Sequence, residues 1–300
     1  MSDADGLVAA VTGGPLPSHA ALRIGQLSLH CLLWGNASAP PILAVHGNGG
    51  HAHWWDALVP YLLPTYRVIA PDLRGHGESD WPATPAYRIE DFSRDLVQLI
   101  EQLALPPVIV VAHSMGARAA AWFAAHHPQH VCAVALLDTS IAGVDAASAA
   151  RWRGKLVGQR QGPSYPDAAA ARAAFRFVPP EPGVDAAIVA DLAYHAVRQR
   201  RPGDWTFRFD RAVLSLDGDG AGDLTELVAA LPCPLWIGRG SGSREVIPRS
   251  TFDALRARRP DIVVHDFAGA HHFFLSHPQR AGRALRAFAD QVSRLERLRS

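Results

Sequence analysis

The sequence is poor in cysteine, the residue that marks disulfide-stabilised and many zinc-binding proteins. It has only three, Cys31, Cys132 and Cys233, which sit in or beside apolar runs. An odd number of cysteines that are not spaced like metal ligands argues against a disulfide framework and against a zinc site. We therefore expect all three to be buried thiols.

Excess charge and long apolar runs are missing as well. Lys and Arg number 29 against 28 Asp and Glu, so no basic surface is expected that would attract nucleic acid or an anionic membrane. No run approaches the roughly 18 apolar residues of a membrane span, and the N-terminus MSDADGLVAAVTGG lacks the regions of a signal peptide. These absences predict a cytoplasmic protein with no nucleic-acid or membrane partner, and they leave its oligomeric state open.

Familiar cofactor and metal motifs are also absent. The sequence contains no G-x-G-x-x-G after a strand-like run, no G-x-x-x-x-G-K-[ST] and no H-E-x-x-H. The first two motifs bind nucleotides through glycine-rich loops, and the third binds zinc on a helix. We expect neither a cofactor nor a metal.

Apolar residues make up 48% of the 300-residue chain, which is enough for one large core. Short apolar runs predict strands at Ala20–Ile24, Leu27–Trp34, Pro41–Val45, Tyr66–Ala70, 108–112, Val131–Leu137, Pro234–Gly238 and Ile262–Phe267. Amphipathic spacing predicts helices at His53–Leu63, Ile89–Leu103, Met115–His126, Leu224–Leu231, Thr251–Arg258 and Pro278–Arg297. The alternation predicts the α/β class, with a mainly parallel sheet flanked by helices, after a loose lead-in over residues 1 to 18.

The alternation is interrupted beyond Gly143. Residues 144–222 are rich in Ala and Arg, contain helical segments such as Ala186–Gln199, and show no buried-strand run. We therefore divide the chain into an α/β core of residues 1–143 and 223–300 and an inserted helical segment of residues 144–222.

A sharp turn is predicted between the strand and the helix of the stretch VIVVAHSMGARAAA, from Val108 to Ala121. Such a turn strains its central residue, here Ser114, and requires small neighbours, here Ala112 and Gly116. Alone, Ser114 could equally be a helix N-cap. As a nucleophile it would need a base, a carboxylate that orients the base, and donors for the oxyanion.

Candidates for these roles follow other predicted strands. Asn48 follows the strand PILAV, Asp138 ends VCAVALLD, and His271 lies in the loop AGAHHFF after the last strand. Ligands of open α/β sheets bind at the carboxyl ends of the strands, where loops from distant parts of the sequence meet. We therefore expect these three residues to lie near Ser114.

Four loop motifs together resemble those of the α/β-hydrolase superfamily. They are His46-Gly47 followed by Trp54-Trp55 (the oxyanion loop), DLRGHGES from Asp72 to Ser79 (the D-x-R-G-x-G-x-S loop), AHSMG (the nucleophile elbow), and Gly269-Ala270-His271 ahead of Pro278 (the histidine loop). The resemblance covers nearly the whole chain outside the inserted segment. It implies the α/β-hydrolase fold, with residues 144–222 as a helical cap.

The resemblance also implies roles for individual residues. Ser114 would be the nucleophile, and His271 the general base and later the general acid. His272 is the alternative base, but His271 has the family's usual spacing before Pro278. The backbone N–H groups of Asn48 and Met115 would form the oxyanion hole.

The acid of the triad has two candidates. Many family members place it after the strand that here reads PLWIG, but the following loop, RGSGSRE, has no Asp and offers only Glu245. The family's other location follows the preceding strand, where this chain has Asp138. We favour Asp138 over Glu245, although an Asp before Thr-Ser could instead cap a turn.

Aromatic and histidine side chains could line a substrate pocket. The candidates are Trp54, His113, Trp152, Tyr194, Trp205 and His272. Ordinary packing would account for most of them equally well. Residues 151–211 hold eleven Arg or Lys against six Asp or Glu, which indicates a solvated basic face or a mild preference for acidic substrates.

The function implied by the resemblance is that of a serine hydrolase acting on a small-molecule acyl substrate and water. A small carboxylic ester or lactone is the leading substrate, cleaved through an acyl-enzyme on Ser114. The same residues could instead hydrolyse a carbon–carbon bond of a β-diketone-like compound, or an amide. A ligand receptor on the same fold is the alternative outside enzymes.

Overall fold

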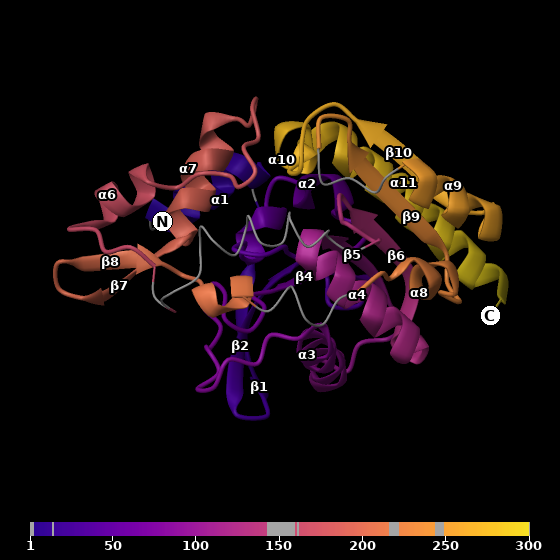
Figure 1. Ribbon diagram of the computed structural model, residues 1–300, viewed down its shortest axis with the longest axis horizontal. Coiled ribbons are helices and arrows are strands. Elements are labelled where there is room, and N and C mark those ends of the chain that lie inside the picture. Colours follow the sequence, from indigo (N-terminus) through magenta and orange to yellow (C-terminus); the bar gives the residue numbers. More distant parts are fainter. Residues whose placement is uncertain are drawn as a thin grey trace.

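A single eight-stranded sheet forms the centre of the computed structural model, which describes residues 3–13, 15–142, 160, 162–215, 222–243 and 249–299 (Figure 1). Its spatial order is β1-β2-β4-β3-β5-β6-β9-β10. The strands are β1 Ser18–Ile24, β2 Leu27–Trp34, β3 Pro41–Val45, β4 Arg67–Pro71, β5 Val108–His113, β6 Val131–Leu137, β9 Leu235–Gly240 and β10 Val263–Phe267. The pairs β1–β2 and β2–β4 are antiparallel, and the other pairs are parallel.

Helices cover both faces of the sheet. The α-helices of the described residues are α1 Asp3–Thr12, α2 Val59–Leu62, α3 Ile89–Gln102, α4 Ser114–His126, α6 Ala168–Ala173, α7 Ala186–His195, α8 Thr225–Ala229, α9 Arg249–Arg258, α10 Phe273–Ser276 and α11 Pro278–Arg299. The 3-10 helices are η1 Ala52–Trp55, η2 Pro128–His130 and η3 Arg211–Ser215. One hydrophobic cluster joins the sheet to α3, α4, α8 and α9, and a second joins it to η1, α2 and α11. No helix in the described part of the chain is long and apolar enough to cross a membrane.

The central strands β3 and β5 are buried at every position, as expected of parallel strands with helices on both faces. The α/β fold and the strands predicted for the sheet are therefore confirmed.

The predicted helix His53–Leu63 is wrong in one respect, because it divides into η1 and α2. Pro60 is the reason: it is tolerated in the first turn of α2, but in a continuous helix it would interrupt the hydrogen-bond ladder. The prediction of three buried thiols is confirmed for Cys31 and Cys233, whereas Cys132 is half-buried.

The N-terminal residues also differ from the prediction. Instead of a loose lead-in, Asp3–Thr12 forms helix α1, which buries Val8 and packs against α7. Figure 1 shows α1 beside α7, at the opposite end of the molecule from α9 and α11. The partner of α1 lies about 180 residues away in the chain, so local composition could not reveal it.

The residues between β6 and β9 contain strands as well as helices. The predicted helix Ala186–Gln199 ends at His195, and Val197–Arg201 forms strand β7, which pairs with β8, Asp204–Phe207. This hairpin corrects the expectation of a purely helical segment, because cross-strand pairing overrides local helix propensity here. Of the predicted segment 144–222, residues 144–159, 161 and 216–221 lie outside the described residues.

Candidate active site

Ser114 lies at the sharp junction between β5 and α4. Its φ is +53°, a left-handed backbone conformation that non-glycine residues rarely adopt. A Cβ at Gly116 would collide with the carbonyl oxygen of His46, so the small residue after the turn is required by a close approach of two backbones. The hydroxyl of Ser114 bonds to the ring of His271 and, among the described bonds, to no backbone N–H of α4, so Ser114 does not act as a side-chain N-cap.

A continuous hydrogen-bond chain joins Ser114, His271 and Asp138. His271 Nε2 lies 2.9 Å from Ser114 Oγ, and His271 Nδ1 lies 2.7 Å from Asp138 Oδ2. With the proton on Nδ1, the imidazole donates to the carboxylate and accepts from the serine hydroxyl, which is the tautomer a general base needs. His271 is 5% exposed and Asp138 is 3% exposed, so water competes weakly for these bonds.

Asp138 is held by donors from the neighbouring strand end. Its Oδ1 accepts from the N–H of Gly240 at 2.9 Å, and its Oδ2 accepts from Ser243 Oγ at 2.6 Å. Hydrogen bonds to a charged group are stronger than neutral ones, so they fix the carboxylate toward His271. The predicted alternative acid, Glu245, lies outside the described residues.

His271 and His272, which are adjacent in the chain, contact different partners. The ring of His272 lies 5.1 Å from that of Trp54 and 5.3 Å from that of Phe177, measured between centroids. Burial, and then the nearby His271, lower the pKa of His272 well below its ordinary value. The ring of His272 is thus part of an aromatic cluster, and the hydroxyl of Ser114 is bonded to His271.

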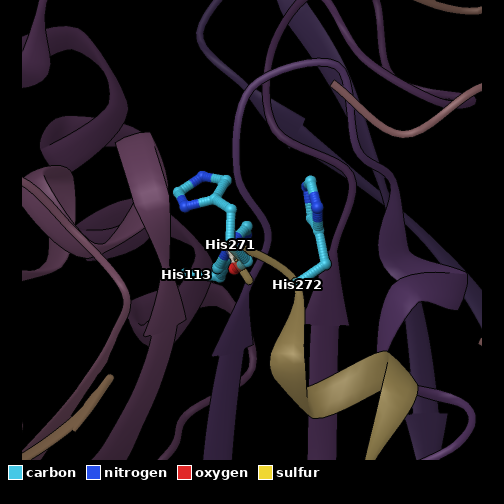
Figure 2. Close-up of side chains that lie close together, drawn as sticks. All are labelled: His113, His271 and His272. Atoms are coloured by element: carbon cyan, nitrogen blue, oxygen red, sulfur yellow. Dashed lines mark hydrogen bonds between the residues drawn. The ribbon is translucent and has the colours of Figure 1, made fainter. Parts of the chain in front are cut away.

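His113, the residue before the nucleophile candidate, contacts the histidine loop. Its Nε2–H donates to the carbonyl oxygen of His271 at 3.0 Å, and Figure 2 shows the three histidines of this region together. Burial, followed by His271 and His272, lowers the pKa of His113 well below its ordinary value. A neutral His113 therefore joins β5 to the loop that carries His271.

Glu181 also contacts the histidine loop, and sequence reasoning missed it. Its carboxylate accepts from the N–H of Ala270 at 2.9 and 3.1 Å, from the N–H of His272 at 2.8 Å, and from Ser276 Oγ at 2.8 Å. Glu181 lies in the segment PPEPG between α6 and α7, which has the composition of a turn. Ser243 was missed for the same reason: no local pattern marks a loop residue whose partner is distant in the chain.

The two expected oxyanion donors come from a helix start and a braced loop. Met115 is the second residue of α4, so its N–H has no acceptor within the helix. The loop of Asn48 is fixed by two neutral histidines: His46 Nε2 accepts from the N–H of Leu73 at 3.0 Å, and His76 Nε2 accepts from the N–H of Gly49 at 3.1 Å. Burial lowers the pKa of His76 to about 3, which keeps Nε2 available as an acceptor.

A cavity of about 510 Å³ adjoins the same loop. It is lined by Gly49, Gly50 and His51 on one side and by residues between β6 and β9 on the other, among them Phe175, Phe207 and Phe209. The predicted pocket residues do not line it. Trp54, His113 and His272 form a buried aromatic cluster, Tyr194 packs under the Arg172 guanidinium, Trp205 bridges to Tyr165, and Trp152 lies outside the described residues.

Among the described residues, two side-chain groups bring possible metal ligands within 4.8 Å of one another: His113, His271 and His272, and His53, Asp191 and His195. In the first group, both ring nitrogens of His271 already bond to Ser114 and Asp138. In the second, the rings of His53 and His195 stack with centroids 3.4 Å apart and planes 16° apart. Their nitrogen lone pairs lie in nearly parallel planes and do not converge on one point, as coordination would require.

Comparison with known proteins agrees with the fold and the kind of chemistry. Residues 40–173 match the family described as alpha/beta hydrolase fold. The chain is 30% identical over 276 residues to the esterase Rv0045c of Mycobacterium tuberculosis, covering 89% of this chain and 87% of that protein. The crystal structure of this esterase has a TM-score of 0.74 at 25% identity, covering 96% of this chain and 98% of the other. The structure of E-2-(acetamidomethylene)succinate hydrolase has a TM-score of 0.79 at 25% identity, covering 91% and 99%.

Proposed function

Since the chain belongs to the α/β-hydrolase family and is a hydrolase, we propose that it cleaves small carboxylic esters or lactones through an acyl-enzyme on Ser114. The observation that carries this proposal is the hydrogen-bond chain from Ser114 through His271 to Asp138, with distances of 2.9 and 2.7 Å. A nucleophile within reach of a base, and a base oriented by a third group, is the arrangement that activates a serine hydroxyl.

In the first half of the reaction, Ser114 Oγ attacks the acyl carbonyl while His271 Nε2 takes the hydroxyl proton. Asp138 stabilises the resulting imidazolium without accepting its proton. The N–H groups of Asn48 and Met115 donate to the oxyanion, and His271 then protonates the departing alcohol. Loss of one oxyanion donor typically costs about 10²–10³ in turnover.

In the second half, water enters and His271 acts again as general base. Its Nε2 removes a proton from the water, which attacks the acyl-enzyme carbonyl, and the proton returns to Ser114 Oγ as the acid departs. No cofactor is required for either half. The same residues could attack an amide or a β-diketone, and no contact of the described site favours these substrates over an ester.

The cavity touches the oxyanion loop at Gly49–His51 but is not lined by Ser114 or His271, so we assign to it the apolar body of the substrate and not the reacting carbonyl. Phenylalanine rings form part of its wall, and Arg176 and Arg208 also line it. Arg208 is paired with Glu78 at 2.7 Å, whereas the Arg176 bonds recorded among the described residues go to the backbone carbonyls of Ala173 and Phe175. We propose that residues 144–222 act as a cap that forms one wall of this cavity, and that Arg176 favours acyl groups carrying a carboxylate.

Turnover of a matched substrate panel tests this function. The panel contains p-nitrophenyl esters of increasing acyl length, one succinate half-ester, the corresponding anilides and a β-diketone. We expect ester hydrolysis to dominate and to fall by at least about 10⁴-fold in Ser114→Ala. Ester turnover that survives in Ser114→Ala, or a preference for the anilide or β-diketone, would contradict the proposal.

A further inference from the structure

Glu181 is unusual because a residue outside the sheet holds the backbone on both sides of His271. The residue before His271 and the residue after it each donate an N–H to the Glu181 carboxylate. Ser276, at the end of α10, donates its hydroxyl to the same carboxylate. Glu181 is only 7% exposed, and it lies 90 residues before His271 in the chain.

The loop needs such a partner because the strand ladder ends before it. Strand β10 ends at Phe267 and α10 begins at Phe273, so neither element supplies acceptors for the N–H groups between them. Buried backbone donors without partners are costly. The Glu181 carboxylate satisfies two of them at once, and bonds to a charged acceptor are stronger than bonds to a neutral one.

The approach of Glu181 also depends on a glycine in this loop. Gly269 has a φ of +110°, and a Cβ there would lie 2.9 Å from Glu181 Oε1. His113 completes the arrangement from the other side, since it donates to the carbonyl oxygen of His271. The peptide groups around His271 are therefore fixed by Glu181 and His113, while the imidazole itself bonds to Ser114 and Asp138.

We propose that Glu181 is a positioning residue that holds the His271 imidazole in line between Ser114 and Asp138. The proposal rests on the proposed function for its effect on turnover. Through Glu181, the segment between β6 and β9 would support the histidine loop as well as form a wall of the cavity. A displacement of about 1 Å in a catalytic group can cost about 10²-fold in rate.

Glu181→Gln tests the proposal with a side chain of nearly the same shape. Glutamine offers one acceptor oxygen, and its NH₂ group would face an N–H donor of the loop. We expect kcat for a p-nitrophenyl ester to fall about 10- to 100-fold. We expect KM to stay within about twofold, because Glu181 does not line the cavity.

Tyr87→Phe is a matched control for lost stability. The hydroxyl of Tyr87 donates to Asp210 at 2.6 Å, which also joins the core to the segment between β6 and β9, and Arg160 still holds Asp210 in the variant. Both variants are expected to lower Tm, but only Glu181→Gln should lower kcat. If Glu181→Gln does not fold, Ser276→Ala removes one bond to the same carboxylate, and a two- to fivefold lower kcat is expected.

A spectroscopic measurement separates this proposal from the proposed function. The His271 Nδ1–H bonded to Asp138 should give a low-field proton resonance that is absent in Asp138→Asn. We expect Glu181→Gln to broaden or abolish this resonance and Tyr87→Phe to retain it. If the wild type does not hydrolyse esters but the resonance behaves in this way in the wild type and the variants, the proposed function is contradicted and the positioning role of Glu181 is not. An unchanged resonance and unchanged kcat in folded Glu181→Gln, or a change confined to KM, would overturn the role of Glu181.

Discussion

Among the histidine–aspartate pairs of the described residues, two that have nearly the same bond length can be compared directly. His271 Nδ1 lies 2.7 Å from Asp138, and His30 Nδ1 lies 2.8 Å from Asp72. Each carboxylate is almost fully buried, and each also accepts from a backbone N–H. Geometry of the pair alone therefore does not distinguish a catalytic role from a structural one.

The difference lies in what each histidine and carboxylate contacts next. His271 continues to the hydroxyl of Ser114, a residue with strained backbone at a helix start. His30 continues to the ring of His19 at 2.9 Å on the exposed edge hairpin. Asp72 instead collects the N–H groups of Ala52 at 2.6 Å and Glu78 at 2.9 Å, which ties three loops together. A buried histidine–aspartate pair is therefore a candidate catalytic site only when the histidine also bonds to a nucleophile.

Of the changes to these two pairs, the loss of turnover in Asp138→Asn is expected to be the largest effect. Asparagine cannot hold the required tautomer of His271, so kcat should fall by at least about a hundredfold and up to about 10⁴-fold. Stability should fall less than in Asp72→Asn, because the amide oxygen can still accept from the N–H of Gly240 while the NH₂ group donates to Ser243 Oγ. Glu245→Gln is the control from the other predicted acid and should leave kcat nearly unchanged. Steady-state ester hydrolysis measures both variants, and the reverse ranking would move the acid to Glu245.

For Asp72→Asn we expect the opposite: a large loss of stability, and a kcat of the folded protein that changes little. Burial alone would raise the pKa of Asp72, but hydrogen bonding and charge from His30 hold it below its usual value. The asparagine NH₂ would face the N–H donors that Asp72 now accepts from, so the free energy of unfolding should fall by about 3–5 kcal/mol. Urea unfolding measures this loss. A stable Asp72→Asn protein with kcat reduced more than tenfold would contradict a structural role.

Acid should weaken the structural network through its histidines. The pKa of His76 is lowered from 6.5 to about 3 in the folded protein by burial. Its contribution is complete above pH 6.5 and is lost as pH falls toward 3, because only the unfolded chain binds the proton in that window. Asp72, with its lowered pKa, acts in the same direction below about pH 4. Each such histidine should contribute a slope of about 1.4 kcal/mol per pH unit.

Urea unfolding between pH 7.5 and 4 measures this slope. His76→Gln can still accept from the N–H of Gly49, so the variant should unfold with a smaller pH dependence than the wild type. A wild-type stability that does not change over this range would show that the neutral form of His76 is not required.

A smaller effect on the His271–Asp138 pair is expected for Ser243→Ala. This change removes one of the donors to Asp138 and leaves the N–H of Gly240 in place. A hydrogen bond to a charged group contributes about 1.5–3 kcal/mol, of which only part acts on the transition state, so kcat should fall about tenfold or less. A loss as large as that in Asp138→Asn would mean that Ser243 acts in the reaction itself.

Sequence reasoning succeeded where local patterns carry the information. Apolar runs predicted the strands, and parallel strand ends place Asn48, Ser114, Asp138 and His271 at one edge of the sheet, because their loops all follow strands. The catalytic roles of these residues stay predictions, but the expected proximity of Ser114, Asp138 and His271 is present in the structure.

The parts of the fold and the site that were not predicted depend on contacts between residues distant in the chain. Glu181 and Ser243 stand in turn-like segments, and only folding brings them to His271 and Asp138. Helix α1 and hairpin β7–β8 are likewise determined by tertiary partners. The pocket prediction relied on aromatic residue type, and type alone cannot tell a cavity wall from a buried cluster such as Trp54 and His272.

Labelling with a fluorophosphonate, followed by peptide mass spectrometry, tests the central claim most directly. The account predicts one adduct on Ser114, loss of ester hydrolysis in proportion to labelling, and no adduct in Ser114→Ala. A folded wild type that remains unlabelled, or that carries the adduct on another residue while Ser114 stays free, would contradict the assignment of Ser114 as the nucleophile.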